Sequence, residues 1–289
     1  HIYKIFLILP IFKTNSFSQN IIFNQSNFLS RSSETRSLVE ALNSSIKFEK
    51  MVNITIPKVS TFISHSIIDE IKTNLNIEKI DLIIVDCSLS PIQHRNLEKI
   101  LEVKVIDRTQ LIIEIFGLRA TSSEGKIQVE LANLNFQKTR LVRSWTHLER
   151  QRGGLGKVGG PGESQLELDK RIIDNKIVQI KKQLLKVKKT RNIQRKRRTD
   201  ISIPIFSLVG YTNSGKSTIF NKLTSSQVLV KDMVFATLDT KMSLVNLPNQ
   251  NKILLTDTVG FISALPTELI SAFNSSLEEL FSADFLLLV

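Results

Sequence analysis

The sequence contains a single cysteine, Cys87, among its 289 residues. One cysteine cannot form a disulfide within the chain, which excludes a disulfide-stapled secreted domain and suits a reducing cytoplasm. Because Cys87 follows a β-forming apolar run, we expect it to be a core residue without chemistry of its own. Long hydrophobic runs are missing too, since no segment approaches the ~20 apolar residues that span a membrane. We therefore expect a cytoplasmic protein without stable membrane insertion.

The apolar N-terminal stretch lacks the features of a signal peptide. Its hydrophobic run, Ile5 to Leu9, is short and lies between Lys4 and Pro10. No cleavage site of small residues follows it. We expect Ile5 to Leu9 to form a buried first strand.

Acidic residues are outnumbered, with 27 acidic against 39 basic side chains and a net charge of +12. This balance favours a polyanionic partner such as nucleic acid, or an anionic membrane surface, although a genome-wide bias toward lysine would also raise the charge. Such a bias does not explain why the charge clusters. Ten basic residues follow one another without an intervening acid: Lys181, Lys182, Lys186, Lys188, Lys189, Arg191, Arg195, Lys196, Arg197 and Arg198. A solvated helix face is the simple interpretation, but no acids are present to form pairs along the helix, so we favour nucleic-acid contact.

The first 122 residues predict an α/β domain with a parallel sheet. Short apolar runs alternate with segments of helical periodicity, and strand, helix and strand in succession favour parallel pairing. Ser90 is a plausible helix cap, and Pro91 suits the first helical position. The expected strands are Ile5–Leu9, Phe48–Ile56, Asp81–Asp86 and Val103–Asp107, and the expected helices are Ile67–Leu75, Pro91–Leu101 and Gln110–Gly117.

Residues 123–199 predict a long antiparallel helical hairpin. Apolar residues recur near helical spacing in two segments, Glu124–Arg152 and Glu163–Arg198. Between them lies a glycine-rich loop, residues 153–162. Two long helices joined in this way form a hairpin, and the loop is longer than a simple connector needs.

Residues 200–289 carry a phosphate-binding loop. Residues 210–217 fit the pattern G-x-x-x-x-G-K-[ST], after an apolar strand at Ile203–Val209 and before a helix at Lys216–Leu223. The glycines let backbone amides turn toward phosphates, and the helix N-terminus adds its dipole. Lys216 would lie by the β- and γ-phosphates, and the Ser217 hydroxyl would bind Mg²⁺. The predicted nucleotide-binding residues of this segment are Gly210, Tyr211, Thr212, Asn213, Ser214, Gly215, Lys216, Ser217 and Thr218.

Two further segments would complete the nucleotide site. Residues 257–260 form D-x-x-G after an expected strand at Lys252–Thr256, which should pair with Met242–Leu247. Asp257 would reach Mg²⁺ through water, and the Gly260 amide would sense the γ-phosphate. Thr237 would complete the Mg²⁺ shell. The predicted binding residues here are Phe235, Ala236, Thr237, Leu238, Asp239, Asp257, Thr258, Val259 and Gly260; the predicted catalytic residues are Lys216, Thr237 and Gly260, and the predicted metal ligands are Ser217, Thr237 and Asp257.

Together these motifs resemble those of the HflX family of translation-factor-related GTPases, over most of the chain. Residues 209–218, 235–239 and 257–262 are similar to its first three nucleotide motifs. Residues 89–98 and 105–109 look like parts of its N-terminal domain, and residues 160–169 are similar to its glycine-rich linker.

The resemblance implies a GTPase that binds GTP and GDP with Mg²⁺, hydrolyses GTP and associates with the large ribosomal subunit. It also implies a role in ribosome splitting or rescue, or in translation under stress. Ribosomal RNA would then be the partner of the basic helix and of the glycine-rich loop. The family's guanine-reading Asn-Lys-x-Asp motif is expected beyond Val289, so we expect residues 200–289 to be part of a larger P-loop GTPase domain. We expect a monomer.

Phe261 follows Gly260 where many GTPases carry a water-orienting glutamine. This predicts slow intrinsic hydrolysis, with a catalytic group supplied by the ribosome or by a rearranged switch. Two other interpretations stay open. The chain could be a GTPase of tRNA modification or ribosome assembly, or an RNA-binding fragment that acts without nucleotide.

Overall fold

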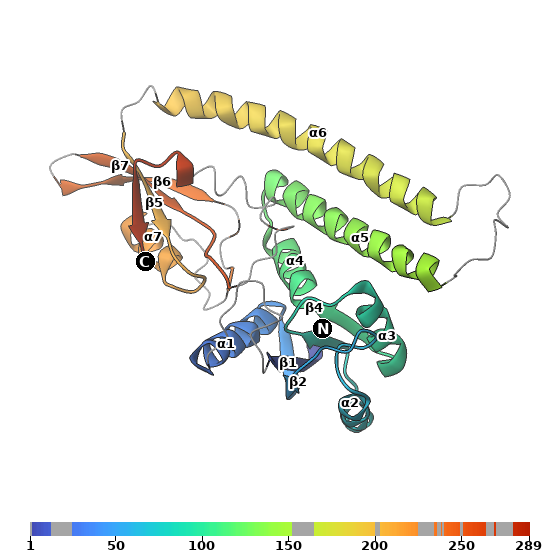
Figure 1. The fold of residues 1–289 in the computed structure, drawn as a ribbon. Coiled ribbons are helices and arrows are strands. Elements are labelled where there is room, and N and C mark those ends of the chain that lie inside the picture. The colour runs from blue at the N-terminus through green and yellow to red at the C-terminus, as the bar shows by residue number, and fades with distance from the viewer. Residues whose placement is uncertain are drawn as a thin grey trace. The chain divides into compact units, whose positions relative to one another are not determined.

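The computed structural model describes residues 2–12, 25–151, 165–199, 203–224, 234–235, 238, 240–248, 251–263, 269 and 280–289. Two compact units contain them (Figure 1): His1–Glu114 with Gln137–Glu167, and Ile115–Phe136 with Leu168–Val289. Each unit has its own four-stranded sheet. The mixed α/β class expected from the sequence is confirmed, and the division at residues 1–122, 123–199 and 200–289 stays a prediction.

The first unit is built on a parallel sheet in the order β2-β1-β3-β4. Its strands are β1 (Tyr3–Phe12), β2 (Ser44–Ile54), β3 (Leu82–Val85) and β4 (Lys104–Asp107). All four expected strands are present, although β2 runs from Ser44 to Ile54 rather than from Phe48 to Ile56. The parallel sheet predicted from alternating strands and helices is therefore confirmed.

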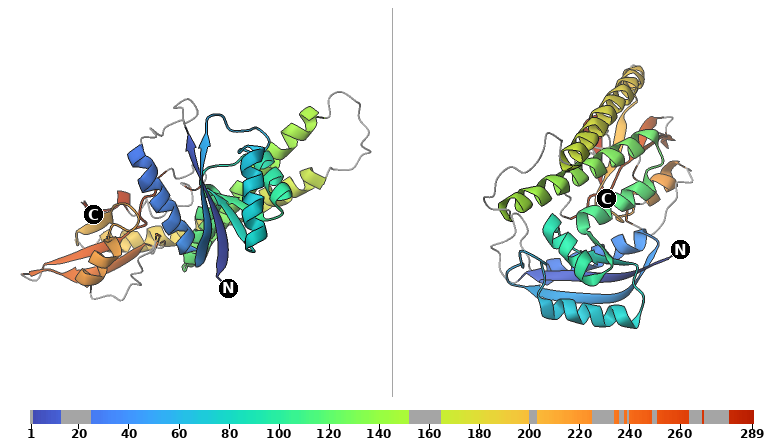
Figure 2. Two further views of the ribbon diagram at one scale, coloured as in Figure 1. Left: turned by 90° about the horizontal axis from the view of Figure 1, so that it is seen from below. Right: turned by 90° about the vertical axis from the view of Figure 1, so that its right-hand side faces the viewer.

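Helices cover both faces of this sheet. They are α1 (Gln25–Ala41), α2 (His65–Ile77), α3 (Pro91–Leu101) and the start of α4 (Arg108–Arg119). Figure 2 shows α1 on one side of the sheet and α2 with α3 on the other. Side chains of β1 alternate between the faces: Phe6 and Ile8 join one core cluster with Ile68 of α2 and Leu97 of α3. Residues 5–9 are all 1% exposed or less, so the expected buried strand is confirmed, and it is buried on both faces.

The start of α3 agrees with the sequence in detail. Ser90 caps the helix: its Oγ accepts a hydrogen bond from the Gln93 amide at 3.3 Å. The Gln93 side chain in turn accepts from the Ser90 amide at 2.9 Å. This reciprocal capping satisfies two backbone donors that a helix start otherwise leaves without partners.

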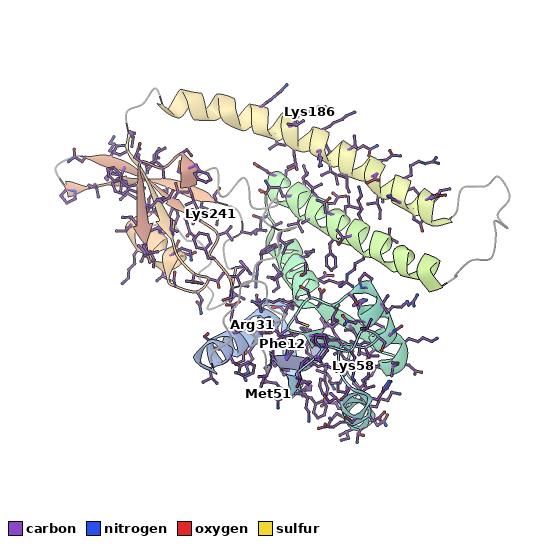
Figure 3. The ribbon with its side chains drawn as sticks, in the orientation of Figure 1. Phe12, Arg31, Met51, Lys58, Lys186 and Lys241 are labelled. Carbon is purple, nitrogen blue, oxygen red and sulfur yellow. The ribbon has the colours of Figure 1, made fainter. Side chains whose placement is uncertain are left out.

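A buried network of charges lies where β3 and β4 end. Arg108, 3% exposed, donates to Asp86 Oδ1 at 2.7 Å and also pairs with Glu34. Arg31 of α1, labelled in Figure 3, donates to the other carboxylate oxygen of Asp86 at 2.9 Å. Because buried charges are tolerated only when paired, this network fixes α1 against the carboxyl ends of the strands. Cys87 next to it is a buried free thiol, as expected, and burial raises its pKa well above the usual range.

Two long helices follow, α5 (Ser123–Gln151) and α6 (Gln165–Thr199). Within the second unit, Leu131 and Leu134 of α5 pack against Ile177 and Ile180 of α6. The helices run in opposite directions there (Figure 1). Both predicted helices are confirmed, while the glycine-rich loop at residues 153–162 lies outside the described residues. Among the described helices, none combines the length and the apolar character needed to cross a membrane.

The second unit also contains the sheet that carries the phosphate loop, in the order β6-β7-β5-β8. Its strands are β5 (Ile205–Val209), β6 (Lys241–Asn246), β7 (Lys252–Asp257) and β8 (Phe285–Leu288), and α7 spans Lys216–Thr224. β5 pairs in parallel with β7 and β8. β6 pairs with β7 as predicted, and the two strands are antiparallel. Phe220 of α7 packs on Leu208, Val245 and Leu255, which anchors the helix to the sheet.

Candidate nucleotide site

The predicted phosphate loop connects the end of β5 to the start of α7. Asn213 and Gly215 adopt left-handed backbone angles, with φ of 63° and 95°. Glycine accepts this conformation without steric cost, and asparagine tolerates it better than most residues. The Ser214 amide donates to the Tyr211 carbonyl at 3.3 Å, and the Ile219 amide donates to Gly215 at 3.0 Å as α7 begins. The loop is therefore a tight turn that delivers the chain to a helix N-terminus.

Lys216 is buried, with 5% of its surface exposed. Its Nζ donates to the Tyr211 carbonyl and, at 3.4 Å, to Ser214 Oγ, so the amine is held within the loop. Burial lowers the pKa of Lys216, and the nearby Asp257 carboxylate raises it in part. Burial removes water from the Lys216 amine, and the loop gives it two neutral oxygen partners but no direct ion pair. Phosphate oxygens would supply the negative charge that stabilises the protonated amine, so the site favours an anion.

Ser217 and Asp257 meet at the same edge of the sheet. The Ser217 hydroxyl donates to Asp257 Oδ2 at 2.7 Å, and the Asp257 residue is 0% exposed. The meeting follows from the fold, because β5 and β7 are parallel neighbours with Leu208 opposite Asp257. A hydroxyl and a carboxylate are the oxygen ligands that Mg²⁺ uses at nucleotide sites. The two residues therefore fit a Mg²⁺ ion.

The segment after Asp257 is attached to the phosphate loop through the backbone. Thr258 Oγ1 donates to the Leu208 carbonyl at 2.6 Å. Phe261 exchanges two backbone hydrogen bonds with the loop: its amide donates to Gly210 at 3.0 Å, and its carbonyl accepts from the Thr212 amide at 2.8 Å. Gly260 lies so close that a Cβ atom there would be 2.6 Å from Thr212 N and Cα and 2.9 Å from Lys216 Nζ. Only glycine allows the two loops to approach this closely.

Of the remaining predicted site residues, the structure describes some and leaves others outside the described ranges. Thr218 lies in the first turn of α7, and Val259 lies between β7 and the bridge formed by Phe261. Leu238 is partly buried, whereas Ala236, Thr237 and Asp239 lie outside the described residues. The structure thus brings the first and third predicted motifs together, while the Mg²⁺ role of Thr237 stays a prediction.

The Phe235 side chain has a different environment from the other site residues. It is 2% exposed, and its ring meets that of Phe116 of α4 edge to face, with centroids 4.6 Å apart. The sequence alone does not connect Phe116 with the site. Its only sequence signal is an apolar position in a helical pattern, which indicates a core residue and no specific partner.

Three family models match consecutive parts of the chain. The N-terminal region of GTP-binding GTPases matches residues 30–117, and the middle region of the same proteins matches residues 119–198. The model described as a 50S ribosome-binding GTPase matches residues 205–289.

Individual proteins agree with these models. The GTPase HflX of Magnetococcus marinus is 54% identical over 228 residues, which is 79% of this chain and 53% of that protein. The GTPase HflX of Escherichia coli is 46% identical over 252 residues, 86% of this chain and 59% of that protein. A crystal structure of a GTP-binding protein from Sulfolobus solfataricus in complex with GDP has a TM-score of 0.52 and 26% identity, and covers 100% of this chain and 70% of that one.

The chain spans between half and three fifths of the length of these HflX relatives. The similarity nevertheless extends through the N-terminal sheet, the two long helices and the phosphate loop, and all three family models describe GTP-binding proteins or their parts. The chain belongs to the HflX family of GTPases.

Proposed function

We propose that the protein binds GTP with Mg²⁺ and hydrolyses it to GDP. The observation that carries this proposal is the buried Lys216 amine inside the loop, next to the 2.7 Å contact between Ser217 and Asp257. A buried amine suited to phosphate, together with a hydroxyl and a carboxylate of the types that bind Mg²⁺, thus lies at one sheet edge. The names of the family relatives and the GDP complex of the Sulfolobus protein support guanine as the base.

Each residue of the site has a separate task in this proposal. Lys216 would stabilise the negative charge that develops on the phosphates. Ser217 and Asp257 would hold the Mg²⁺ ion, and Thr237 would complete its ligands. Mg²⁺, when bound, neutralises phosphate charge. These tasks need positioned charges rather than a covalent intermediate, which agrees with the residue types in the two loops.

Nucleotide binding would compete with the bridge between the loops. The Thr212 amide now donates to the Phe261 carbonyl, and the Lys216 amine donates to its own loop. A phosphate that takes these donors must replace both contacts. The segment at Gly260 and Phe261 would consequently move when a triphosphate binds, which is the behaviour of a GTPase switch.

The intrinsic reaction should be slow. The Phe261 side chain is apolar and 45% exposed, and it has no polar atom that could orient the attacking water. We propose that a group from the ribosome or from the rearranged switch supplies this step.

We further propose that the protein associates with the large ribosomal subunit and its RNA, as a cytoplasmic monomer acting in ribosome splitting or rescue. The match of residues 205–289 to the ribosome-binding GTPase model supports this partner. The basic stretch of α6 would supply a polyanion-binding surface, since Lys181, Lys182, Lys186 and Lys189 are exposed there (Lys186 is labelled in Figure 3). Exposed cations bind phosphate backbones by releasing counterions.

Nucleotide turnover tests the first proposal, measured with GTP and with ATP on the protein expressed from its complete gene. GTP should be hydrolysed and ATP should not, and Lys216→Ala should remove the activity. Lys222→Ala, on the same helix, is the matched control and should retain it. Equal turnover of both nucleotides, or full activity of Lys216→Ala, would contradict the proposal.

Co-sedimentation with large and small ribosomal subunits tests the second proposal. Replacing the four exposed α6 lysines by glutamine should weaken binding to the large subunit and reduce its salt dependence. The control replaces four exposed lysines of the first unit, Lys72, Lys79, Lys99 and Lys104, which changes the net charge equally. Equal effects of both sets would point to non-specific attraction, and preference for the small subunit would favour a different ribosomal role.

A further inference from the structure

Thr258 follows directly after β7, and its hydroxyl is used inside the protein. The residue is 2% exposed, and Thr258 Oγ1 donates to the Leu208 carbonyl of β5 at 2.6 Å. A buried hydroxyl that donates over this short distance is fixed in direction. Its proton is therefore engaged with the sheet, although the residue belongs to one of the two motifs that meet at the candidate site.

The Leu208 carbonyl is the acceptor that the next bond of the parallel ladder would use. The Leu254 amide donates to the Pro204 carbonyl at 2.9 Å, and in parallel pairing such bonds recur evenly along the two strands. Four residues further along both strands, the same bond would join residue 258 to Leu208. β7 ends at Asp257, so the Thr258 side chain extends the attachment to β5 beyond the end of the strand.

Asp257 is held on both sides by these contacts. Its backbone is paired with β5 opposite Leu208, and the residue after it is tied to the Leu208 carbonyl. Its side chain is 0% exposed and accepts from the Ser217 hydroxyl at 2.7 Å. Without the Thr258 contact, the chain could turn away from β5 directly after Asp257, and the carboxylate would have more directions open to it.

We propose that Thr258 is a positioning residue for the Mg²⁺ site, acting through Asp257. The inference rests on the proposed GTPase function and gives Thr258 a role other than nucleotide contact. Its hydroxyl holds the backbone so that the Asp257 carboxylate faces Ser217, where both groups can bind one cation. Removing a group that orients a metal ligand typically lowers metal affinity by about 10–100-fold.

The test measures GDP affinity by calorimetry, in EDTA and across a Mg²⁺ titration, on the protein expressed from its complete gene. Thr258→Val keeps the shape of the side chain and removes the hydroxyl. It should raise the Mg²⁺ concentration for half-maximal tightening of GDP binding by about 10–100-fold, and leave the affinity in EDTA unchanged. Thr258→Ser keeps the hydroxyl and should behave like the wild type. Thr258→Ala removes the same hydroxyl with a smaller side chain, and it provides the measurement if the valine variant does not fold.

Thr256→Val is the matched control. Thr256 lies two residues earlier in β7 and is 1% exposed, and its hydroxyl has no hydrogen-bond partner within the described part of the chain. The same substitution at this position should leave the Mg²⁺ titration unchanged. In an Asp257→Asn background, Thr258→Val should have little further effect, since both changes act on one ligand.

Three results would overturn the inference: an unchanged Mg²⁺ titration in Thr258→Val, an equal shift in Thr256→Val, or additive effects with Asp257→Asn. Weaker GDP binding in EDTA would also overturn it, because the hydroxyl would then contact the nucleotide itself. A wild-type protein that binds no GDP at any Mg²⁺ concentration would instead refute the proposed function on which the inference rests.

Discussion

Replacing Gly260 by alanine should force the two loops of the nucleotide site apart. The new Cβ would lie 2.6 Å from Thr212 Cα and N, and 2.9 Å from Lys216 Nζ. Because carbon atoms pack at about 3.5–4.0 Å, the loops would separate by roughly 1 Å. The two backbone hydrogen bonds of Phe261, now 2.8 and 3.0 Å, would then exceed hydrogen-bonding range. Losing both, at about 0.5–1.5 kcal/mol each, lowers the free energy of unfolding by about 1–3 kcal/mol.

Catalysis should suffer more than stability. A shift of about 1 Å in a catalytic group can reduce a rate roughly a hundredfold, and Lys216 is among the atoms displaced. Urea unfolding and steady-state GTP hydrolysis measure the two effects. Gly117→Ala is the control: a Cβ at this exposed position of α4 would meet nothing within 4 Å. It should raise the free energy of unfolding by about 0.5–1 kcal/mol, because alanine favours a helix over glycine. A Gly260→Ala protein with wild-type stability and turnover would refute the close contact.

Three further predictions follow from the site and the fold. Ser217→Ala should raise the Mg²⁺ concentration for half-maximal hydrolysis by about tenfold or more, and an unchanged Mg²⁺ titration would contradict its role as a ligand. Arg108→Met should lower the free energy of unfolding in urea by about 3 kcal/mol, since it removes a guanidinium from the buried Asp86; an unchanged midpoint would show that the ion pair contributes nothing. GDP affinity should fall as pH rises through the lowered pKa of Lys216 toward the ordinary value of 10.5, because phosphate prefers the protonated amine. Over that window the nucleotide-free protein should become more stable, since the unfolded state binds the extra proton. Calorimetry across a pH series measures both, and a flat affinity would count against a buried cation at the phosphates.

The phosphate loop could be predicted because its conformation depends on residue types that are adjacent in the sequence. Gly215 takes a left-handed angle, Lys216 opens a helix, and the loop follows a buried strand. These features stand next to one another in the sequence. The meeting of Ser217 with Asp257 was predictable for a related reason, since the strand before each motif is apolar and parallel neighbours align their carboxyl ends.

Helix α1 was not predicted, and its composition gives the reason. Its buried face contains Ser32 and Thr35, 2% and 0% exposed. Their hydroxyls donate to the carbonyls of Leu29 and Arg31 at 2.9 and 3.0 Å, which satisfies them inside the fold. Because these buried positions are polar, the segment lacks the apolar residues at helical spacing that indicate a helix in a sequence.

The contact between Phe116 and Phe235 was equally hidden from the sequence. Each phenylalanine stands in an apolar context, and nothing local indicates that residues so far apart would meet. The charged network around Arg108 is a similar case, because Glu34, Asp86 and Arg108 come from three separate elements. Tertiary contacts of this kind depend on the path of the chain, which periodicity does not reveal.

The most direct test of a ribosome-linked GTPase is turnover of GTP by the protein expressed from its complete gene, with and without large ribosomal subunits. The account predicts slow turnover alone and a marked increase with large subunits, with small subunits ineffective. The increase should vanish in Lys216→Ala and be reduced when the four exposed α6 lysines are replaced. Turnover that is fast without ribosomes, or that large subunits leave unchanged, would contradict the account.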